Sequence, residues 1–435
     1  MADIVQTAEA AVVVPDPFDA RRAQTADGLL AAFNAAGVLA AADVHVARRL
    51  GVIAGEEADD VLLAVALAVR GPRLGHVYVD LATIATTATV ESDMPVDLSE
   101  LAWPHPEAWI AAVAGSALVR DGEDEGAGAR ADAEARPLRL VGSHLYLDRY
   151  WREELRVAED LVAFAADPAE GVDVDVLSAG LARLFPGEEG GGRQALAAAT
   201  AVLRRFTVVA GGPGTGKTTT VARIVALLLE QASAAGAGPP LIALAAPTGK
   251  AAARLEEAVH EQAAGLKVAD SIRAALLELD AGTLHRLLGW RPDSHSRFRH
   301  HRGNRLPHDV VIVDETSMVS LSLMGRLVES VRPDARLILV GDPGQLTSIE
   351  AGAVLGDVVG PAADGLLMRP GARAALEEAA TGQKVQAADP PAGSVVGDGI
   401  VVLNRVHRFH GGIAELAEAI RRGDGDEVMQ VLSAG

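Results

Sequence analysis

The stretch Phe206–Thr220, FTVVAGGPGTGKTTT, decides the fold. Its first five residues favour a buried strand, and Gly211–Thr218 fit the pattern G-x-x-x-x-G-K-[ST] before a helical segment. Glycines let backbone N–H groups wrap around phosphates, Lys217 supplies a positive charge, and the Thr218 hydroxyl can ligate Mg²⁺. A glycine-rich turn with an incidental lysine is the alternative, but a strand before the loop and a helix after it favour a phosphate-binding loop.

Outward from this loop, three more short β-rich runs follow: Leu241–Ala246, Val310–Val313 and Leu337–Val340. Each run is followed by polar or glycine-rich residues, and helical stretches separate the runs. Buried strands that alternate with helices form a parallel, doubly wound sheet. Ligands of such sheets bind beyond the carboxyl ends of the strands. The fold class predicted is α/β.

The second and third candidate sites lie at two of these strand ends. In VVIVDE, Asp314 can hold the Mg²⁺ that bridges the phosphates, and Glu315 can take a proton from the attacking water. An acidic pair after a strand can also be a helix cap, but an upstream phosphate loop favours catalysis. In LILVGDPGQLTSIEAG, the Gln345 amide can sense the γ-phosphate or orient the water.

Two further segments, APTGKAAAR (Ala246–Arg254) and GTLHR (Gly282–Arg286), also follow strands. Small residues with hydroxyl groups and exposed N–H groups suit contact with a sugar–phosphate backbone. A helix cap and a helix start are equally good readings of these residues taken alone.

The segment Arg291–His308, RPDSHSRFRHHRGNRLPH, is strongly basic in an otherwise acidic chain. Gly303-Asn304 predicts a hairpin turn, and the arginines suggest a finger that touches DNA phosphates; a solvated surface hairpin is the alternative. Metal ligation is rejected, because adjacent His300 and His301 would point to opposite faces of a strand.

Composition limits the setting of the protein. The 435 residues include no cysteine and carry a formal net charge of −20. A disulfide scaffold, a thiol nucleophile and a zinc finger are excluded, and without a signal-peptide pattern or a long apolar run we expect a cytoplasmic protein. The acidic charge means that any DNA must be bound by a local groove or with partner subunits.

Domain boundaries follow from the breaks RDGEDEGAGARADAEARP (Arg120–Pro137), read as an exposed loop, and FPGEEGGGRQ (Phe185–Gln194). The residues before Arg120 read mostly as helix, and LRLVGSHLYLDRYW after the first break reads as a short hairpin. The domains expected are a mainly helical N-terminal domain (1–150), a linker (151–190) and a first motor domain (191–370) with a small basic hairpin inserted (290–308). The last segment (371–435) is expected to hold an insertion and the start of an incomplete second motor domain.

The order of the motifs GGPGTGKTTT, APTGKAAARL, GTLHRLLG, VVIVDETSMV, GDPGQLTSIEAGAVLGD and VHRF resembles superfamily 1 helicases of the 5′-to-3′ class. Within that class it resembles the RecD family, the alpha subunits of exodeoxyribonuclease V (RecBCD). The resemblance implies a P-loop NTPase (RecA-like) motor that uses ATP and Mg²⁺ on single- and double-stranded DNA in double-strand break repair by recombination. It also implies RecB-like and RecC-like partner subunits, on which the N-terminal domain would dock.

The resemblance also implies roles for individual residues. Gln194 would read adenine, Asp314 and Thr218 would hold Mg²⁺, and Arg408 after the strand at Val401 would complete the γ-phosphate contact. The other nucleotide contacts would be Gly211, Gly212, Pro213, Gly214, Thr215, Gly216, Lys217, Thr218 and Thr219. The catalytic residues would be Lys217, Glu315, Gln345 and Arg408. The DNA contacts would be Thr248, Lys250, Thr283 and His285.

In one respect the sequence departs from the family pattern. Members of the family continue into a second motor domain with two later motifs, and neither motif is found before Gly435. The alternative expectation is therefore a nucleotide-binding assembly subunit with little motor activity. A small-molecule kinase is a weaker reading, because GDPGQL and APTGKAAARL have no role in one.

Overall fold

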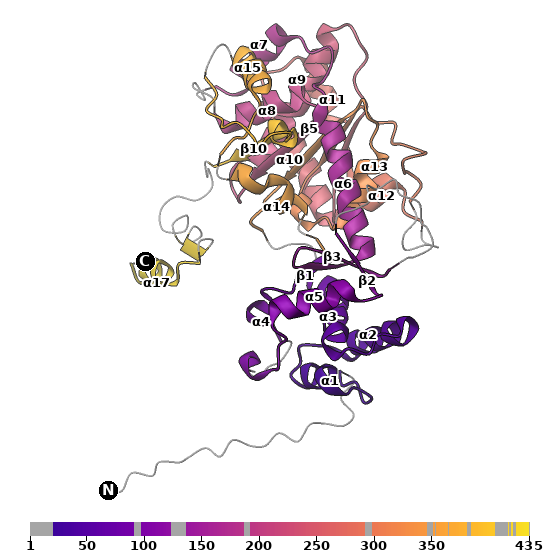
Figure 1. Ribbon diagram of the computed structural model, residues 1–435. Helices are drawn as coiled ribbons and strands as arrows, with labels where there is room; N and C mark the ends of the chain where they lie inside the picture. The colour runs from indigo at the N-terminus through magenta and orange to yellow at the C-terminus, as the bar shows by residue number, and fades with distance from the viewer. Residues whose placement is uncertain are drawn as a thin grey trace, which may run out of the picture. The chain divides into compact units, whose positions relative to one another are not determined.

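The computed structural model describes residues 21–90, 97–122, 136–186, 192–291, 298–345, 351–352, 354–363, 365–380, 384–404, 416, 419–420 and 423–434. Figure 1 shows the chain, which divides into two compact units, Met1–Trp151 and Arg152–Gly435.

The N-terminal unit combines helices with a small sheet. Its elements are α1 (Gly28–Ala35), α2 (Ala41–Ala54), α3 (Asp59–Arg70), η1 (Gly71–Leu74), β1 (Tyr78–Asp80), α4 (Ile84–Thr87), η2 (Leu98–Glu100), α5 (Pro106–Gly115), β2 (Val119–Asp121), β3 (Leu138–Val141) and β4 (His144–Leu147). The strand order is β1-β4-β3-β2. Helix α3 lies at the centre of the core, with Leu63 and Val65 fully buried.

The helical expectation for this unit is confirmed, and Gly37, with a φ of 77°, stands in the break between α1 and α2. The expected hairpin is also present, since β3 and β4 pair in antiparallel fashion. The exposed loop was expected to begin at Arg120, and this predicted boundary is too early in the chain. Arg120 and Asp121 belong to β2, which pairs with β3, and residues 123–135 lie outside the described residues.

The second unit is built on a sheet of six strands. Its elements begin within α6 (Asp148–Ala166) and continue with α7 (Val174–Leu184), α8 (Arg193–Leu203), β5 (Phe206–Gly211), α9 (Lys217–Ala234), β6 (Ile242–Ala246), α10 (Gly249–Gly265), α11 (Asp270–Leu277), β7 (Ala281–Thr283), α12 (Leu284–Leu288), β8 (Val310–Val313), η3 (Thr316–Met318), α13 (Leu321–Ser330), β9 (Arg336–Gly341), α14 (Val354–Val359), η4 (Gly360–Ala363), α15 (Pro370–Ala379), η5 (Val396–Gly399), β10 (Ile400–Leu403) and α17 (Gly425–Ala434).

The sheet order is β10-β5-β9-β8-β6-β7, and every pair of neighbours is parallel. The four strands predicted from sequence are β5, β6, β8 and β9, so the α/β fold class is confirmed. Their side chains are almost all buried, because helices cover both faces of a doubly wound sheet.

The segment expected as a linker, 151–190, is a structured part of the second unit. It contains most of α6 and the whole of α7. Helix α7 buries Leu177, Leu181 and Leu184 in the same core as α8 and α9. Apolar residues at this helical spacing make an amphipathic helix, which packs and does not serve as a spacer.

The segment 371–435 was expected to hold an insertion and the start of a second motor domain, and its first part packs on the first sheet. Helix α15 buries Ala372 and Leu376 in the core of the first sheet. Strand β10 pairs with β5 over the register from Ile400–Val208 to Leu403–Gly211. The domain built on the six-stranded sheet therefore extends at least to Leu403, because the strand before the glycine loop takes a neighbour from this late part of the chain.

Candidate nucleotide and DNA site

The predicted nucleotide-binding residues gather at one edge of the sheet. Strands β5, β9 and β8 are consecutive neighbours, and the glycine loop, Gln345 and Asp314 follow their carboxyl ends in turn. The register places Ala210 opposite Gly341, and Val313 opposite Leu339. The topology thus brings together three motifs that are far apart in the sequence.

The glycine loop has the backbone conformation that its sequence requires. Gly214 and Gly216 have φ values of 77° and 83°, which glycine adopts without strain. Lys217 Nζ donates to the carbonyl oxygens of Gly211 and Gly212, at 2.5 and 3.0 Å. Thr218 and Thr219 follow Lys217 in the first turn of α9. The loop therefore ends in a helix N-terminus, the arrangement that binds anions.

Gln194 lies directly against this loop. Its Nε2 donates to the carbonyl oxygen of Thr215 at 3.0 Å, and Arg223 Nη1 lies 3.4 Å from its Oε1. A Cβ at Gly216 would lie 2.3 Å from Gln194 Nε2, so only glycine fits there. Gln194 therefore stabilises the glycine loop through its hydrogen bond to Thr215, and adenine recognition by Gln194 stays a prediction.

The acidic pair has the setting of a cation site. Asp314 is 8% exposed, and burial raises the pKa of its carboxyl to about 6, although the Glu315 amide and the nearby Lys217 act in the opposite direction. A buried carboxylate near the lysine of the glycine loop, whose next residue Thr218 carries a hydroxyl, offers oxygen ligands of the kind that a divalent cation prefers. The donor set therefore suits Mg²⁺.

Glu315 is held in a costly conformation. Its φ of 52° makes it the one non-glycine residue with positive φ in the described part of the chain. Its N–H donates to Asp314 Oδ1 at 2.8 Å. Backbone strain of this kind is characteristic of functional sites, because the surrounding structure must hold it in place.

Sequence reasoning missed the two residues that follow. The Thr316 hydroxyl lies 3.0 and 2.8 Å from the carbonyl oxygens of Val313, the last residue of β8, and Val340, near the end of β9. The hydroxyl of Ser317, a buried residue, donates to Gln345 Oε1 at 3.1 Å. The sequence does show two hydroxyl residues directly after Asp314-Glu315. Only the pairing of β8 with β9 shows that these hydroxyls reach the neighbouring strand and the loop that follows it.

The two segments expected to contact DNA lie side by side, because β6 and β7 pair with Ala246 opposite Thr283. Thr248 caps α10 by accepting from the Ala251 N–H at 3.2 Å, and Thr283 caps α12 in the same way. Both hydroxyls therefore have the structural role that was weighed against DNA contact. Lys250 and His285 are exposed at this edge, and their contact with DNA stays a prediction.

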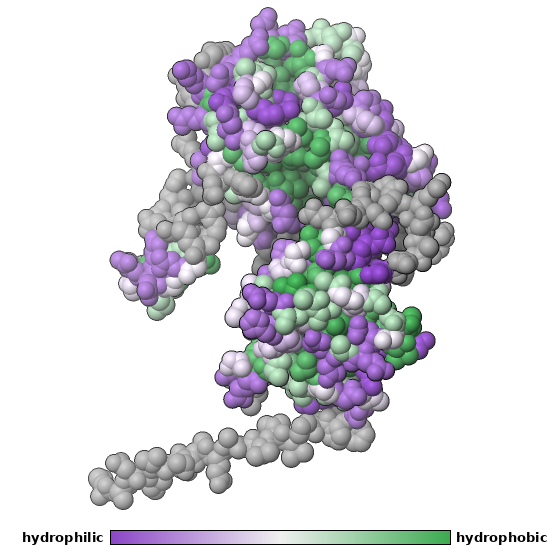
Figure 2. Space-filling view, viewed as in Figure 1, coloured by the Kyte–Doolittle hydropathy of each residue, from purple (hydrophilic) through white to green (hydrophobic). Residues whose placement is uncertain are grey.

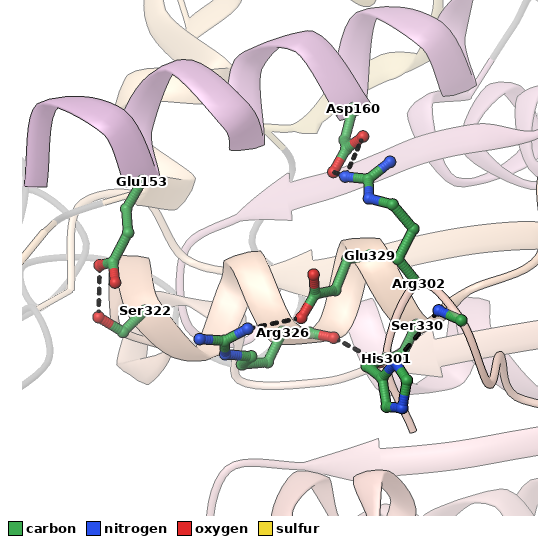
Figure 3. Close-up of polar contacts among 9 residues, drawn as sticks. Glu153, Asp160, His301, Arg302, Ser322, Arg326, Glu329 and Ser330 are labelled. Atoms are coloured by element: carbon green, nitrogen blue, oxygen red, sulfur yellow. Dashed lines mark hydrogen bonds and ion pairs between the residues drawn. The ribbon is translucent and has the colours of Figure 1, made fainter. Parts of the chain in front are cut away.

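The basic segment forms a small hairpin that is only partly described. Its turn is Arg302-Gly303, one residue earlier than expected, because His301 and Asn304 exchange backbone hydrogen bonds of 3.1 and 2.8 Å. Residues 292–297 lie outside the described residues. Figure 3 shows Arg302 bonded to Asp160 of α6, while Arg305 donates to the carbonyl oxygen of Val331. Two of the arginines thus serve the fold.

Arg408 lies outside the described residues, as do Arg405 and His407. The strand expected at Val401 is confirmed as β10, so its carboxyl end emerges beside the glycine loop: a Cβ on Gly211 would lie 3.0 Å from Leu403 Cβ. The γ-phosphate contact of Arg408 stays a prediction.

These features define a P-loop nucleotide-binding protein with a helicase-type arrangement of strand-end motifs. A family model described as an AAA domain matches residues 194–351. A second model, described as the N-terminal domain of the RecBCD enzyme subunit RecD, matches residues 35–146.

Three curated proteins are similar to this chain. A "RecBCD enzyme subunit RecD" from Mycolicibacterium smegmatis is 49% identical over 407 residues, covering 94% of this chain and 62% of that protein. The protein of the same name from Mycobacterium tuberculosis H37Rv is 49% identical over 413 residues, covering 94% of this chain and 61% of its own length. An "ATP-dependent RecD2 DNA helicase" from Deinococcus radiodurans is 40% identical over 114 residues, covering 26% of this chain and 13% of that protein. The chain is similar to the RecD proteins over almost its whole length, and it spans about three fifths of the length of these mycobacterial relatives.

Within the described residues, no helix is both long enough and apolar enough to cross a membrane.

Proposed function

We propose that the chain is the ATP-hydrolysing motor part of a RecD-type DNA helicase subunit, which moves 5′-to-3′ on DNA during double-strand break repair by recombination. The observation that carries the proposal is the convergence of Lys217, the Asp314-Glu315 pair and Gln345 at the ends of three adjacent parallel strands. A relative whose name is ATP-dependent RecD2 DNA helicase supports it.

The residues divide the chemistry among themselves. Lys217 and the loop N–H groups would bind the phosphates, and Thr218 and Asp314 would hold Mg²⁺, which would supply positive charge against the phosphates. Glu315, the carboxylate next to Asp314, would accept the proton of the attacking water. Gln345, held by Ser317, senses the phosphate from the neighbouring strand.

Steady-state ATPase activity tests this function. We expect the chain to hydrolyse ATP with Mg²⁺, single-stranded DNA to stimulate the rate, and Lys217→Ala to abolish it. Glu315→Gln should bind ATP without turnover, which separates the binding role from the catalytic role. Tight ATP binding without any turnover, either alone or with partner subunits, would favour a nucleotide-binding assembly subunit instead.

Partner subunits of RecB and RecC type are part of the proposal. Helix α2 exposes Val46, Val52 and Ile53 at 41%, 74% and 67%, and Figure 2 shows hydrophobic surface over this helix. Exposed apolar clusters of this kind mark interaction surfaces. A double substitution, Val52→Ser with Ile53→Ser, should reduce copurification with the partner subunits and leave ATP binding unchanged.

A further inference from the structure

A connected set of side chains ends on the glycine loop. Gln194 Nε2 donates to the carbonyl oxygen of Thr215 at 3.0 Å. Arg223 Nη1 donates to Gln194 Oε1 at 3.4 Å, and the Arg223 guanidinium carbon lies 4.7 Å from the centre of the Phe185 ring. We call Gln194 and Arg223 the glutamine–arginine pair.

The pair and its aromatic neighbour come from three helices of one core. Phe185 directly follows α7, Gln194 is the second residue of α8, and Arg223 lies in the second turn of α9, the helix that the glycine loop opens. Phe185 is 5% exposed and Gln194 is 8% exposed. Because α7, α8 and α9 pack on one another, these side chains are positioned by the fold and need no nucleotide to bring them together.

The two ends of the Gln194 amide differ chemically, and each end has a matching partner. The nitrogen is a donor and meets a carbonyl oxygen, whereas the oxygen is an acceptor and meets a guanidinium. A flipped amide would place Oε1 against the Thr215 carbonyl oxygen and Nε2 against Arg223, so two attractive contacts would become repulsive. Arg223, which also gains a cation–π contact with Phe185, therefore fixes which end of the amide points at the loop.

The loop meets this amide at its most unusual backbone. Thr215 lies between Gly214 and Gly216, whose φ values are 77° and 83°. A Cβ on Gly216 would lie 2.3 Å from Gln194 Nε2, so the amide fills the space beside the loop. The hydrogen bond from Gln194 thus holds the peptide units whose N–H groups would bind phosphates.

We propose that the glutamine–arginine pair positions the glycine loop for the phosphates of a nucleoside triphosphate, and that its contribution to affinity is independent of the base. Arg223 is a positioning residue that acts on Thr215 through Gln194. This proposal rests on the proposed function for its ligand. It adds to that function a residue outside the sequence motifs, and it separates the loop contact of Gln194 from adenine recognition.

Calorimetric titration of the full chain compares ATP, GTP and inorganic triphosphate, each with Mg²⁺. ATP and GTP differ in the base, and inorganic triphosphate has neither base nor ribose. Gln194→Met keeps the length of the side chain without the amide, and Arg223→Ala removes the guanidinium. Each substitution should weaken the binding of all three ligands by the same factor, about 3- to 10-fold, the usual scale of one hydrogen bond.

The double variant, Gln194→Met with Arg223→Ala, tests whether Arg223 acts through Gln194. We expect it to bind no more weakly than Gln194→Met alone, since residues that act through one another are not additive. A general loss of packing would not give this pattern. Arg149→Ala is the matched control, because it removes a guanidinium whose carbon lies 4.4 Å from the centre of the Tyr150 ring in the N-terminal unit. It should leave all three affinities unchanged.

A loss confined to ATP in Gln194→Met would overturn the proposal in favour of base recognition and leave the proposed function standing. Additive losses in the double variant would overturn it as well, because Arg223 would then act without Gln194. If the wild type binds none of the three ligands, the proposed function fails together with the glutamine–arginine pair. If Arg223→Ala does not fold, the comparison of the three ligands in Gln194→Met still decides.

Discussion

Arg302 of the basic hairpin binds Asp160 of α6, with one guanidinium nitrogen 2.9 and 2.7 Å from the two carboxylate oxygens (Figure 3). Helix α6 in turn contacts α13, where Ser322 donates to Glu153 at 2.6 Å. The hairpin is therefore tied to a long helix at its turn and to α12 at its base. Arg302 therefore holds the hairpin in place.

Asp160→Asn tests this anchor. Arg302 is 55% exposed, so the loss of the pair should change the free energy of unfolding by less than about 1 kcal/mol. The amide of Asn304, which bonds to His301 across the turn, should nevertheless exchange its hydrogen faster. Glu230→Gln is a matched control, since it removes a carboxylate of comparable burial from Arg183. Unchanged exchange at Asn304 in Asp160→Asn would refute the anchor.

Ser317→Ala should uncouple DNA binding from hydrolysis. Without the Ser317 hydroxyl, Gln345 Oε1 loses its hydrogen-bond donor. The orientation of the side-chain amide, oxygen towards Ser317 and nitrogen away from it, is then no longer fixed. We expect ATP affinity to stay within about twofold, while the stimulation of ATPase rate by single-stranded DNA falls about tenfold, the usual scale of one hydrogen bond in a transition state. Ser317→Thr should restore most of the stimulation; equal losses in both variants would point to a packing defect instead.

Glu315→Gly should stabilise the protein relative to Glu315→Ala. Both variants lack the carboxylate, but the backbone at this position has a φ of 52°, which costs an L residue roughly 1 kcal/mol and costs glycine little. Urea unfolding should therefore rank glycine above alanine by about that amount, and both variants should lack ATPase activity. A reversed ranking would mean that the loop relaxes once the glutamate is gone.

His308 should make the motor unit less stable in mild acid. Burial lowers the pKa of its imidazole, with His300 and Arg332 acting in the same direction and Asp309 against it, and Nδ1 has no partner within the described residues. Because the unfolded chain takes up the proton more readily, the stability that neutral His308 contributes is complete above about pH 6.5 and declines as the pH falls below it.

Urea unfolding of wild type and His308→Gln on both sides of that pH measures the effect. The substitution should reduce the loss of stability on acidification. His45→Gln, which removes an exposed imidazole on α2, controls for the substitution itself. Parallel pH profiles for His308→Gln and the wild type would exclude His308 as the source.

The sequence was sufficient where the chemistry is local. A phosphate-binding loop needs a strand before it and a helix after it. The motif at Gly211–Thr218 therefore supports the strand predicted at Phe206–Ala210, and that strand supports the motif. The same reasoning located Asp314 and Gln345 at strand ends. It could not find Ser317, whose partner is 28 residues away and meets it only through the pairing of β8 with β9.

Boundaries were harder to predict for the same physical reason. Helix α7 reads as a short segment beside a glycine-rich break, and its burial depends on α8 and α9, which the local pattern does not reveal. Strand β10 was expected, but its pairing with β5 was not. Four apolar residues in a row predict a buried strand, and they do not indicate which strand will be its neighbour.

The place of β10 also bears on how the protein is made. Val208 of the phosphate-loop strand pairs with Ile400, so the ribosome must add almost two hundred residues before that pair can form. At typical synthesis rates of about 5–20 residues per second, roughly 10–40 s pass before the second neighbour of β5 is available. An open, apolar strand edge is a template for aggregation. We therefore expect the nascent chain to be more prone to aggregation before Leu403 has emerged than after it.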